Sequence, residues 1–253
     1  MKHINKVALV TGSSRGLGRA IALKLAADGA DIIVTYREKK DEADQVAAEI
    51  QKLGRKAAVL QIDVADTKTF ETFAKTVAET LESTWQRKSF DFLVNNAGID
   101  VWSPFDQMTE EGFDRLVNVH FKGVYFLTQK LLPYIADGGR IVNTSSGLAR
   151  FSVPGYSAYG ALKGAIEVLT RYMAKELGHR KISANVVAPG VVETDFTRRA
   201  LSDEKMKAHL ESNTALGRVG QPEDIAGVVT FLCSEEARWV NAQRVEASGG
   251  MFL

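Results

Sequence analysis

The sequence predicts one α/β domain in which helices cover both faces of a parallel sheet of about seven strands. Short apolar runs alternate with segments of helical periodicity along all 253 residues, a pattern typical of successive βαβ units. Several runs are apolar throughout, as expected of strands buried on both faces. No repeat or low-complexity linker interrupts the pattern, so we expect residues 1–253 to form a single domain.

The expected elements follow from these two periodicities. We predict strands over residues 7–10, 31–35, 57–61, 92–95, 140–143, 182–187 and 244–245. We predict helices over residues 17–28, 38–53, 67–84, 110–135, 156–178 and 222–234. Gly29 and Gly54 stand where the first two helices should end, because glycine readily adopts the left-handed conformation found there.

The composition indicates a globular protein with a small ligand. Hydrophobic residues make up 45% of the chain and charged residues 25%, the ordinary balance for a domain with a large core. The 32 Lys and Arg residues nearly cancel the 31 Asp and Glu residues, which leaves no excess charge to attract nucleic acid or an anionic membrane. We therefore expect a small-molecule substrate, no nucleic acid and no membrane.

The sequence favours the cytoplasm. No stretch reaches about 18 consecutive apolar residues, the length needed to span a membrane, and the apolar run 7–10 is too short for a signal-peptide core. Cys233 is the only cysteine, so no intrachain disulfide can form, and we expect this side chain to pack against the core. No metal site is expected.

A glycine-rich turn follows the first predicted strand. Residues 11–18 read Thr-Gly-Ser-Ser-Arg-Gly-Leu-Gly, which places Gly12, Gly16 and Gly18 between a strand and a helix. Glycines there let the backbone approach a pyrophosphate above the helix N-terminus. The triple is a weak signal alone, but its position at the start of an α/β chain predicts a dinucleotide site.

The end of the second strand indicates which dinucleotide is expected. An acidic residue there would accept hydrogen bonds from a ribose 2′-hydroxyl, whereas an arginine accommodates a 2′-phosphate. The strand ends at Tyr36 and Arg37, and Arg15 extends from the glycine turn; two guanidinium groups suit a dianion. We therefore favour NADP(H) over NAD(H). The alternative is that Arg37, Lys39 and Lys40 form only a solvated helix start.

Tyr159 and Lys163 stand four residues apart in a predicted helix, so their side chains share one face. An ammonium beside a phenol favours the phenolate and would lower the pKa of Tyr159 from its ordinary value of about 10. Such a tyrosine can transfer a proton near neutral pH. Most pairs with this spacing are surface contacts, so other signals must support it.

Polar and small residues after two other strands supply that support. Ser145 and Ser146 follow the strand over 140–143, and residues 95–98 read Asn-Asn-Ala-Gly at the end of the preceding strand. The carboxyl ends of parallel strands meet at one edge of the sheet, where α/β proteins bind their ligands. We expect these residues to share one site with Tyr159.

On these motifs the chain resembles the short-chain dehydrogenase/reductase family, in particular the 3-oxoacyl-acyl-carrier-protein reductases. The resemblance runs essentially end to end. It implies a Rossmann fold with a seven-stranded sheet, a homotetramer, and NADP(H)-dependent hydride transfer to a carbonyl or from a secondary alcohol. The motifs that carry it are residues 11–18, Asp63-Val64, residues 95–98, Asn118, Ser146, Tyr159 with Lys163, and Pro189-Gly190 with Thr194.

The resemblance implies four catalytic residues. Tyr159 would be the general acid in reduction, and Ser146 would donate a hydrogen bond to the substrate oxygen. Lys163 would lower the pKa of Tyr159 and bind the nicotinamide ribose, while Asn118 would hold a water that connects Lys163 to solvent. Ser146 is chosen because it lies thirteen residues before Tyr159; Ser145 is expected to satisfy backbone groups at the strand end.

The resemblance also implies the cofactor contacts. Asp63 would bind the adenine amino group beside Val64, and Thr194 would lie near the nicotinamide carboxamide. The expected cofactor-binding residues are Gly12, Ser14, Arg15, Gly16, Leu17, Gly18, Tyr36, Arg37, Asp63, Val64, Asn95, Ala97, Gly98, Tyr159, Lys163, Pro189, Gly190, Val192 and Thr194.

The chain lacks the basic cluster that acyl-carrier-protein reductases carry before the strand leading to the serine pair. Residues 136–139 read Ala-Asp-Gly-Gly and only Arg140 follows, which makes docking of a carrier protein doubtful. Arg171, Arg180 and Lys181 would form a smaller basic patch or, as the alternative, salt-bridged surface charge.

Two further segments depart from the family. Residues 85–88 form an insertion that we expect on the surface. Residues 240–250 differ from the usual sequence at the subunit-packing end, and the apolar tail 251–253 would either cover a neighbour's pocket or dock on the sheet.

We expect an apolar, partly aromatic substrate surface under a lid formed by residues 190–220; the alternative for this segment is a plain pair of surface helices. Such a surface suits an acyl chain, a ring ketone or an aryl ketone. The expected lining residues are Trp102, Gly147, Leu148, Phe151, Val153, Tyr156, Val191 and Met206. Trp102 and Phe151 are equally typical of a core or an interface.

Other functions stay open at this point. An alcohol dehydrogenase for sugars or steroids would share all these motifs. A non-catalytic NADP-binding sensor would not need Asn118, Ser146, Tyr159 and Lys163 together, and a nucleic-acid-associated protein would need a basic surface. Assays on a panel of carbonyl compounds would separate these functions.

Overall fold

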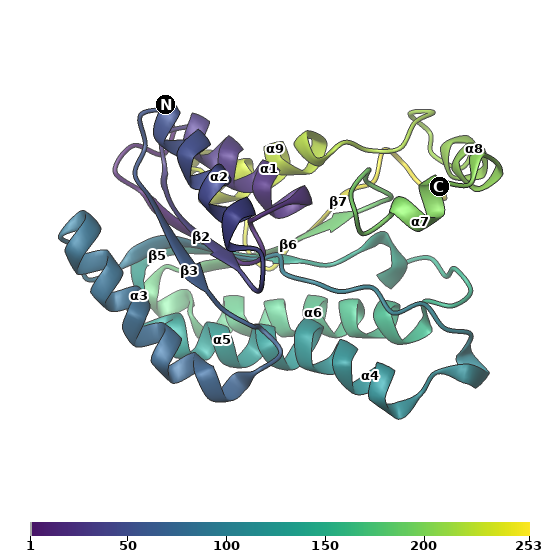
Figure 1. Ribbon diagram of the computed structural model, residues 1–253, viewed down its shortest axis with the longest axis horizontal. Coiled ribbons are helices and arrows are strands. Elements are labelled where there is room, and N and C mark those ends of the chain that lie inside the picture. The colour runs from purple at the N-terminus through teal and green to yellow at the C-terminus, as the bar shows by residue number, and fades with distance from the viewer. Residues whose placement is uncertain (1) are drawn as a thin grey trace.

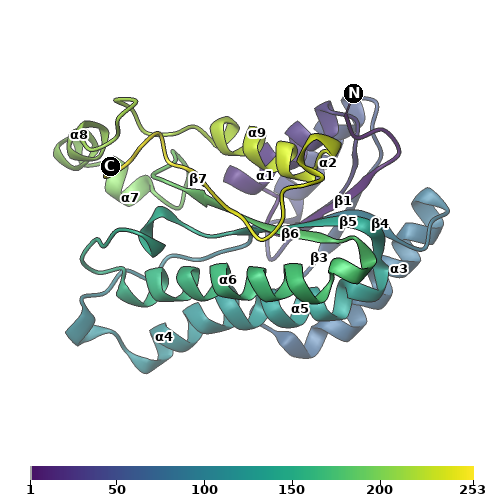
Figure 2. The ribbon, with the colours of Figure 1, turned by 180° about the vertical axis from the view of Figure 1, so that it is seen from behind.

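A computed structural model describes residues 2–253 and confirms the predicted fold class (Figures 1 and 2). In this part of the chain, seven parallel strands form one sheet in the order β3-β2-β1-β4-β5-β6-β7. Successive strands are added outward in one direction from β1 to β3 and in the other from β4 to β7. The direction changes between β1 and β4, so the ligand crevice is expected above the carboxyl ends of these two strands.

The strands lie close to their predicted positions. They are β1 (Val7–Val10), β2 (Asp31–Tyr36), β3 (Ala57–Gln61), β4 (Phe90–Asn95), β5 (Ile135–Thr144), β6 (Ser183–Pro189) and β7 (Arg244–Ala247). The largest difference is β5, which begins five residues before its predicted start. Ile135 pairs with Phe90, and an irregularity in the ladder accommodates the glycine-containing residues before Arg140.

Helices cover both faces of the sheet (Figure 1). On one side lie α1 (Gly16–Ala27), α2 (Lys40–Lys52) and α9 (Pro222–Cys233), and on the other lie α3 (Phe70–Trp85), α4 (Glu110–Val117), α5 (Gly123–Leu131) and α6 (Ser157–Glu176). Two apolar clusters follow from this arrangement. In β1, Ala8 and Val10 belong to the first cluster and Val7 and Leu9 to the second, which explains why the whole strand is apolar.

The continuous helix predicted over residues 110–135 is wrong. A π-helical turn (Asn118–Lys122) separates α4 from α5, and a 3-10 turn (Leu132–Tyr134) precedes β5. The π turn lies beside the carboxyl end of β3, where a Cβ on Gly123 would be 2.2 Å from the carbonyl oxygen of Val64. Single π turns inside helices often occur at functional sites, and this one carries Asn118.

The late segment contains two short helices, α7 (Arg198–Leu201) and α8 (Glu204–Ser212). Both lie beyond the end of the sheet, near the C-terminus (Figure 2). None of the helices within residues 2–253 is both long and apolar enough to cross a membrane.

The structure also places Cys233 and the insertion over residues 85–88. Cys233 is buried in the first apolar cluster, as predicted. The insertion over residues 85–88 does more than cover the surface: Trp85 is half-buried and its Nε1 donates to Asp31 at 2.8 Å, while Arg87 forms an ion pair with Asp91 at 2.8 Å. The insertion therefore ties the end of α3 to β2 and β4.

Candidate active site

The carboxyl ends of β1 and β4 are joined by hydrogen bonds. The Thr11 hydroxyl accepts the backbone N–H groups of Asn96 at 2.9 Å and Ala97 at 3.0 Å. In return, the Asn96 amide donates to the Thr11 carbonyl at 3.0 Å. The glycine turn and the Asn-Asn-Ala-Gly segment are therefore bound to each other at the point between β1 and β4 where the strand order changes direction.

Gly12 and Gly18 must be glycines because other backbone atoms lie close to where a Cβ would be. A Cβ on Gly18 would lie 2.3 Å from the Gly12 carbonyl oxygen, and one on Gly12, whose φ is +64°, would lie 3.0 Å from the Ala97 Cα. The turn leads into α1, and within residues 2–253 no side chain caps the N-terminus of that helix. Its first N–H groups therefore suit a bound anion, which fits a dinucleotide pyrophosphate.

Arg15 and Arg37 are exposed and each has an acidic neighbour. Arg37 lies 2.8 Å from Glu38, and Arg15 lies 3.4 Å from Asp195. Exposed ion pairs contribute little stability, so a phosphate dianion would displace these carboxylates at small cost. The Arg15–Asp195 pair also connects the glycine turn to the segment after β6.

The predicted adenine-side residues differ in their environments. Asp63 is exposed, with its Oδ1 accepting the Ala65 N–H at 2.9 Å. The Asn95 side chain is buried and donates to Thr128 at 3.0 Å and to Asn143 at 2.8 Å. This amide joins β4 to β5 and α5, so any cofactor contact from Asn95 would have to come from its backbone.

The residues after β6 lie over the glycine turn. A Cβ on Gly16 would be 3.8 Å from the Thr194 side chain, and one on Gly190 would be 2.9 Å from the Ser248 Cα. Val192 pairs with Gly220 in an isolated parallel bridge. The structure therefore brings this predicted nicotinamide-side segment to the same crevice as the pyrophosphate-side turn.

Ser146 and Tyr159 meet because the loop after β5 packs tightly on α6. A Cβ on Gly160 would be 2.7 Å from the Leu148 carbonyl oxygen, so the residue after Tyr159 must be small. The Ser146 hydroxyl accepts the Leu148 N–H at 3.2 Å, and it lies close enough to the Tyr159 hydroxyl to lower the pKa of the phenol. Ser145 faces away and donates to Glu167 at 2.7 Å and to the Lys163 carbonyl at 3.3 Å, the structural role expected of it.

Lys163 is buried beside Tyr159. Its Nζ donates to the Thr144 carbonyl at 2.8 Å and lies 5.5 Å from the centre of the Tyr159 ring. Burial lowers the pKa of Lys163 to about 7, since a charged amine is poorly solvated there.

The pKa of Tyr159 moves in the direction opposite to the prediction. Burial raises it above its ordinary value, the Asp100 charge adds to the rise, and the hydrogen bond with Ser146 opposes it. The expected lowering by Lys163 is not among the causes of the shift, and burial dominates because the tyrosine lies in a poorly solvated place. Tyr159 is therefore held in its protonated form, the form that a general acid in reduction requires.

A buried histidine that sequence reasoning missed lies against Tyr159. The rings of His120 and Tyr159 are perpendicular, with centres 5.1 Å apart. His120 Nε2 lies 2.8 Å from the carbonyl oxygen of Ile99 and 3.3 Å from its nitrogen, while Nδ1 has no partner within residues 2–253. Burial and the Lys163 charge lower the pKa of His120 to about 3, so the imidazole is neutral.

His120 explains why residue 98 is glycine, because a Cβ there would lie 2.9 Å from the imidazole Cε1. Asn118 starts the same π turn, and its carbonyl accepts the Gly123 N–H. No hydrogen bond within residues 2–253 joins the Asn118 side chain to Lys163 or Tyr159, so its water-holding role stays a prediction. The sequence offered one sign of His120, which is that a polar residue stands between the apolar residues Val119 and Phe121.

Aromatic side chains gather around Tyr159. Tyr156 and Phe196 lie with ring centres 6.4 Å and 5.9 Å from it. A Cβ on Gly155 would be 2.1 Å from the Trp102 indole nitrogen, and the Arg199 guanidinium lies 5.1 Å from the centre of that ring. Phe151 packs in the same way on Gly147, next to Ser146. Tyr156 and Phe196 therefore lie beside Tyr159, Trp102 and Phe151 pack on neighbouring loop glycines, and α7 contacts Trp102 through Arg199.

Two of the basic residues considered for a carrier protein, Arg140 and Arg180, are bound to other parts of the chain. Arg140 is buried and donates to the Gly139 carbonyl at 3.2 Å. Arg180 forms an ion pair with Asp137 at 2.8 Å and donates to the Leu132 carbonyl at 2.9 Å. Of the two alternatives for Arg180, a basic patch for a carrier protein or salt-bridged surface charge, the structure therefore favours the second.

Together, the glycine turn before α1 and the group formed by Ser146 with the buried Tyr159 and Lys163 define a dinucleotide-dependent oxidoreductase. Comparisons with known proteins agree with this class. A family model described as enoyl-(acyl carrier protein) reductase matches residues 12–252. A hydroxynaphthalene reductase-like protein of Metarhizium brunneum is 37% identical over 257 residues, covering 97% of this chain and 94% of the relative.

Solved structures give the same result. The angucycline C-6 ketoreductase LanV with bound NADP is similar with a TM-score of 0.94 at 37% identity, covering 99% of this chain and 97% of that one. LanV with NADP and rabelomycin gives a TM-score of 0.90 at 36% identity, covering 99% and 98%. The chain belongs to the short-chain dehydrogenase/reductase family, and it is an oxidoreductase that acts on CH–OH groups.

Proposed function

We propose that this protein is an NADPH-dependent ketoreductase whose substrate is a cyclic aryl ketone. The observation that carries the proposal is the aromatic setting of the site: Tyr156 and Phe196 lie beside the Tyr159 ring, Trp102 packs on Gly155 directly before Tyr156, and Phe151 packs on Gly147 directly after Ser146. Flat aromatic walls favour a flat ring ligand, since aromatic pairs gain energy beyond the area that they bury. Relatives named for hydroxynaphthalenes and angucyclines support the same substrate class.

NADPH is proposed over NADH because Arg15 and Arg37 flank the place expected for the adenosine 2′-phosphate. Both guanidinium groups are exposed and have the geometry to bind a phosphate with two parallel hydrogen bonds. The bound NADP in LanV supports this choice. The remaining predicted contacts, Asp63, Val64, Ala97, Gly98 and Thr194 among them, belong to the same proposal.

The chemistry assigns one task to each catalytic residue. A bound reduced nicotinamide supplies the hydride to the carbonyl carbon. Tyr159 donates its phenolic proton to the carbonyl oxygen, and Ser146 donates a hydrogen bond that stabilises the charge developing there. Lys163, with a pKa of about 7, is suited to returning a proton toward the tyrosine, and Asn118 is assigned the water that would replenish it. Neutral His120 packs against the tyrosine ring and is itself anchored to the Ile99 backbone.

Residues 190–220 are proposed as the lid over this substrate. Two contacts support the proposal: Arg15 with Asp195 at 3.4 Å, and Arg199 over the Trp102 ring at 5.1 Å. Both join the segment to opposite sides of the crevice. A lid of this kind would exclude water during proton transfer.

A homotetramer is proposed from an exposed apolar face. Its large side chains come from α4, α5 and α6 and are Phe113, Tyr125, Phe126, Val168 and Tyr172. An apolar patch of this kind is typical of a subunit interface. Light scattering on the purified protein would test the subunit number. A cytoplasmic location is proposed with it, on the composition and the single cysteine.

The function is tested by following NADPH oxidation with a panel of cyclic aryl ketones, acetoacetyl thioesters and keto sugars, with NADH in parallel. We expect the highest kcat/KM with an aryl ketone and NADPH. Activity only on acetoacetyl thioesters would replace this substrate class by 3-oxoacyl thioesters. Binding of NADPH with no reduction of any carbonyl would indicate a non-catalytic sensor.

A further inference from the structure

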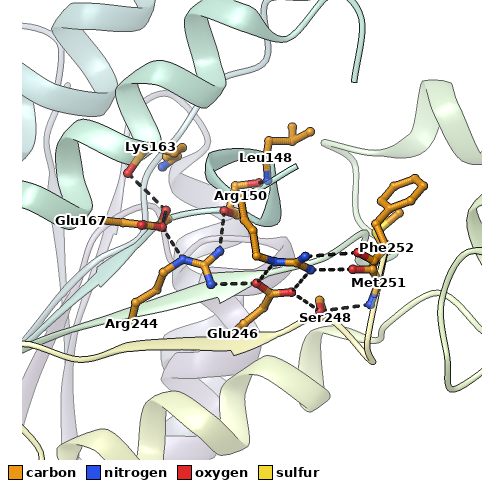
Figure 3. Close-up of polar contacts among 11 residues, drawn as sticks. Leu148, Arg150, Lys163, Glu167, Arg244, Glu246, Ser248, Met251 and Phe252 are labelled. Carbon is orange, nitrogen blue, oxygen red and sulfur yellow. Dashed lines mark hydrogen bonds and ion pairs between the residues drawn. The ribbon is translucent and has the colours of Figure 1, made fainter. Parts of the chain in front are cut away.

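The C-terminal residues 248–252, called here the C-terminal segment, lie against the loop that carries Ser146 (Figure 3). The Phe252 ring packs on the Phe151 ring with centres 4.8 Å apart. On the other side, the Phe252 N–H donates to the Asn213 carbonyl at 2.9 Å, directly after α8. The tail thus docks on its own chain, between the Ser146 loop and the proposed lid.

One side chain, Arg150, holds this segment to the loop. Its guanidinium binds Glu246 with two hydrogen bonds of 2.9 Å and 2.7 Å. It also donates to the carbonyl oxygens of Met251 at 2.7 Å and Phe252 at 3.2 Å. Figure 3 shows this guanidinium between the β7 carboxylate and the two tail carbonyls. Because Arg150 follows Ser146 by only four residues, the tail and the catalytic loop are coupled through a short path.

A network of charged side chains links Arg150 to Ser146 and to α6. Glu246 also accepts hydrogen bonds from Arg244 and Ser248, each at 2.7 Å. Arg244 donates to the Ser146 carbonyl at 3.3 Å and to Glu167 at 2.6 Å. The ion pair with Arg150 is the main cause of a pKa of about 2 for Glu246, so the network is ionised at any pH at which the enzyme would be assayed.

The segment is held in a conformation that contacts must maintain. Phe252 has a φ of +51°, which is uncommon for a bulky residue and costs free energy. A Cβ on Gly249 would lie 2.9 Å from the Thr214 side chain, and one on Gly250 would lie 2.8 Å from the Ala215 Cβ. The backbone of the segment therefore fits closely against the residues after α8, and the Phe252 ring is directed onto Phe151.

From these contacts we infer that the C-terminal segment is part of the substrate-binding surface, with Arg150 as its positioning residue and Phe252 as a specificity-determining residue for bulky ketones. The inference rests on the proposed ketoreductase function. Phe252 extends the aromatic wall begun by Phe151, so a large ring substrate reaches it and a small ketone does not. The network around Arg150 and Glu246 keeps this wall at a constant distance from Ser146.

The test compares Phe252→Ala with Leu253→Ala, its neighbour in the tail, whose side chain is 95% exposed. For each variant, KM and kcat are measured with the aryl ketone that the wild type reduces best and with the smallest ketone that it reduces. We expect Phe252→Ala to raise KM for the aryl ketone about tenfold, since an aromatic contact is lost. KM for the small ketone, the dissociation constant of NADPH and all constants of Leu253→Ala should stay within about twofold of wild type.

Arg150→Gln tests the coupling, and Arg238→Gln, which changes an exposed arginine before β7, is the control. We expect Arg150→Gln to reproduce the substrate-selective rise in KM, and the double variant with Phe252→Ala to be no worse than either single variant, because both act through the segment. Arg238→Gln should leave both ketones unaffected.

Three results would overturn the inference. If Phe252→Ala leaves KM for the aryl ketone unchanged, the segment is not part of the substrate surface. If KM rises equally for both ketones, or NADPH binding weakens as well, the segment has only a general structural role. If the wild type reduces no ketone at all, the proposed function fails and the inference fails with it; active wild-type enzyme with an unaffected Phe252→Ala overturns the inference alone.

Discussion

Replacing Lys163 by methionine should stabilise the cofactor-free protein at neutral and acidic pH while abolishing its activity. Burial lowers the pKa of Lys163 from 10.5 to about 7, which corresponds to about 5 kcal/mol of unfavourable free energy in the charged form at 1.36 kcal/mol per pH unit. Methionine loses the 2.8 Å hydrogen bond to the Thr144 carbonyl, at a cost of about 1–3 kcal/mol. The expected net gain is therefore about 2–4 kcal/mol.

The stability difference between Lys163→Met and the wild type should depend on pH. Below about pH 7 the lysine is protonated in both folded and unfolded chains, so the full cost of burying the charge is present. Between about pH 7 and 10.5 the unfolded chain binds a proton that the folded chain has released, and the stability of the wild type rises with pH relative to the variant. The advantage of Lys163→Met should therefore be largest below pH 7, disappear between about pH 8.5 and 10, and become a deficit of about 1–3 kcal/mol near pH 10.5, where only the lost hydrogen bond remains.

Thermal unfolding followed by circular dichroism across this range is the assay. The expected gain below pH 7 corresponds to an increase in Tm of roughly 5–15 °C for a chain of this length. Lys175→Met, which removes an exposed lysine from the same helix, is the control and should follow the wild type at every pH. Parallel pH profiles for wild type and Lys163→Met would refute the reasoning, because they would mean that Lys163 carries no burial cost.

Three further changes test the site. Tyr159→Phe should lower kcat by about 10²–10⁴ and leave the dissociation constant of NADPH within about twofold; retained turnover would remove Tyr159 from its role. Arg37→Ala should weaken NADPH binding by about 10- to 100-fold, since a charge-assisted contact is lost, with no effect on NADH; equal loss for both cofactors would place the guanidinium away from the 2′-phosphate. His120→Phe keeps a ring against Tyr159 but loses the contact with Ile99, so kcat should fall about tenfold with KM unchanged. Because burial lowers the pKa of His120 to about 3, the shape of the pH profile of kcat between about pH 5 and 9 should be the same in the variant; a lost titration step there would contradict a neutral histidine.

Local patterns predicted well wherever one segment dictates its own structure. The apolar runs of β1 and β2 are buried on both sides, and the glycine turn before α1 adopts the positive φ values at Gly12 and Gly16 that its composition allows. The i, i+4 spacing of Tyr159 and Lys163 places both on α6 with Ser146 nearby. In these cases the determining contacts lie within a few residues or at the shared edge of a parallel sheet.

Predictions were wrong where distant segments compete with local preference. Periodicity favoured one helix over residues 110–135, but that segment contains a π turn beside Val64 and ends in a strand residue, Ile135, paired with Phe90. The cofactor contact at Asn95 stays a prediction, but nothing in the sequence indicated that its amide is buried between β5 and α5. His120 gave no motif because its partners, Ile99 and Tyr159, come from other elements.

The sequence by itself determined the class of fold, and it predicted the place of the dinucleotide site and the residue proposed as proton donor. Periodicity, glycine spacing and residues at strand ends are local properties, and the parallel sheet brings strand ends together without further information. The tertiary structure alone decided how those residues behave. Burial, not the neighbouring ammonium, sets the pKa of Tyr159, and Arg150 joins the catalytic loop to carbonyls 101 and 102 residues further along the chain. Both effects depend on what surrounds a side chain in space, which no local pattern contains.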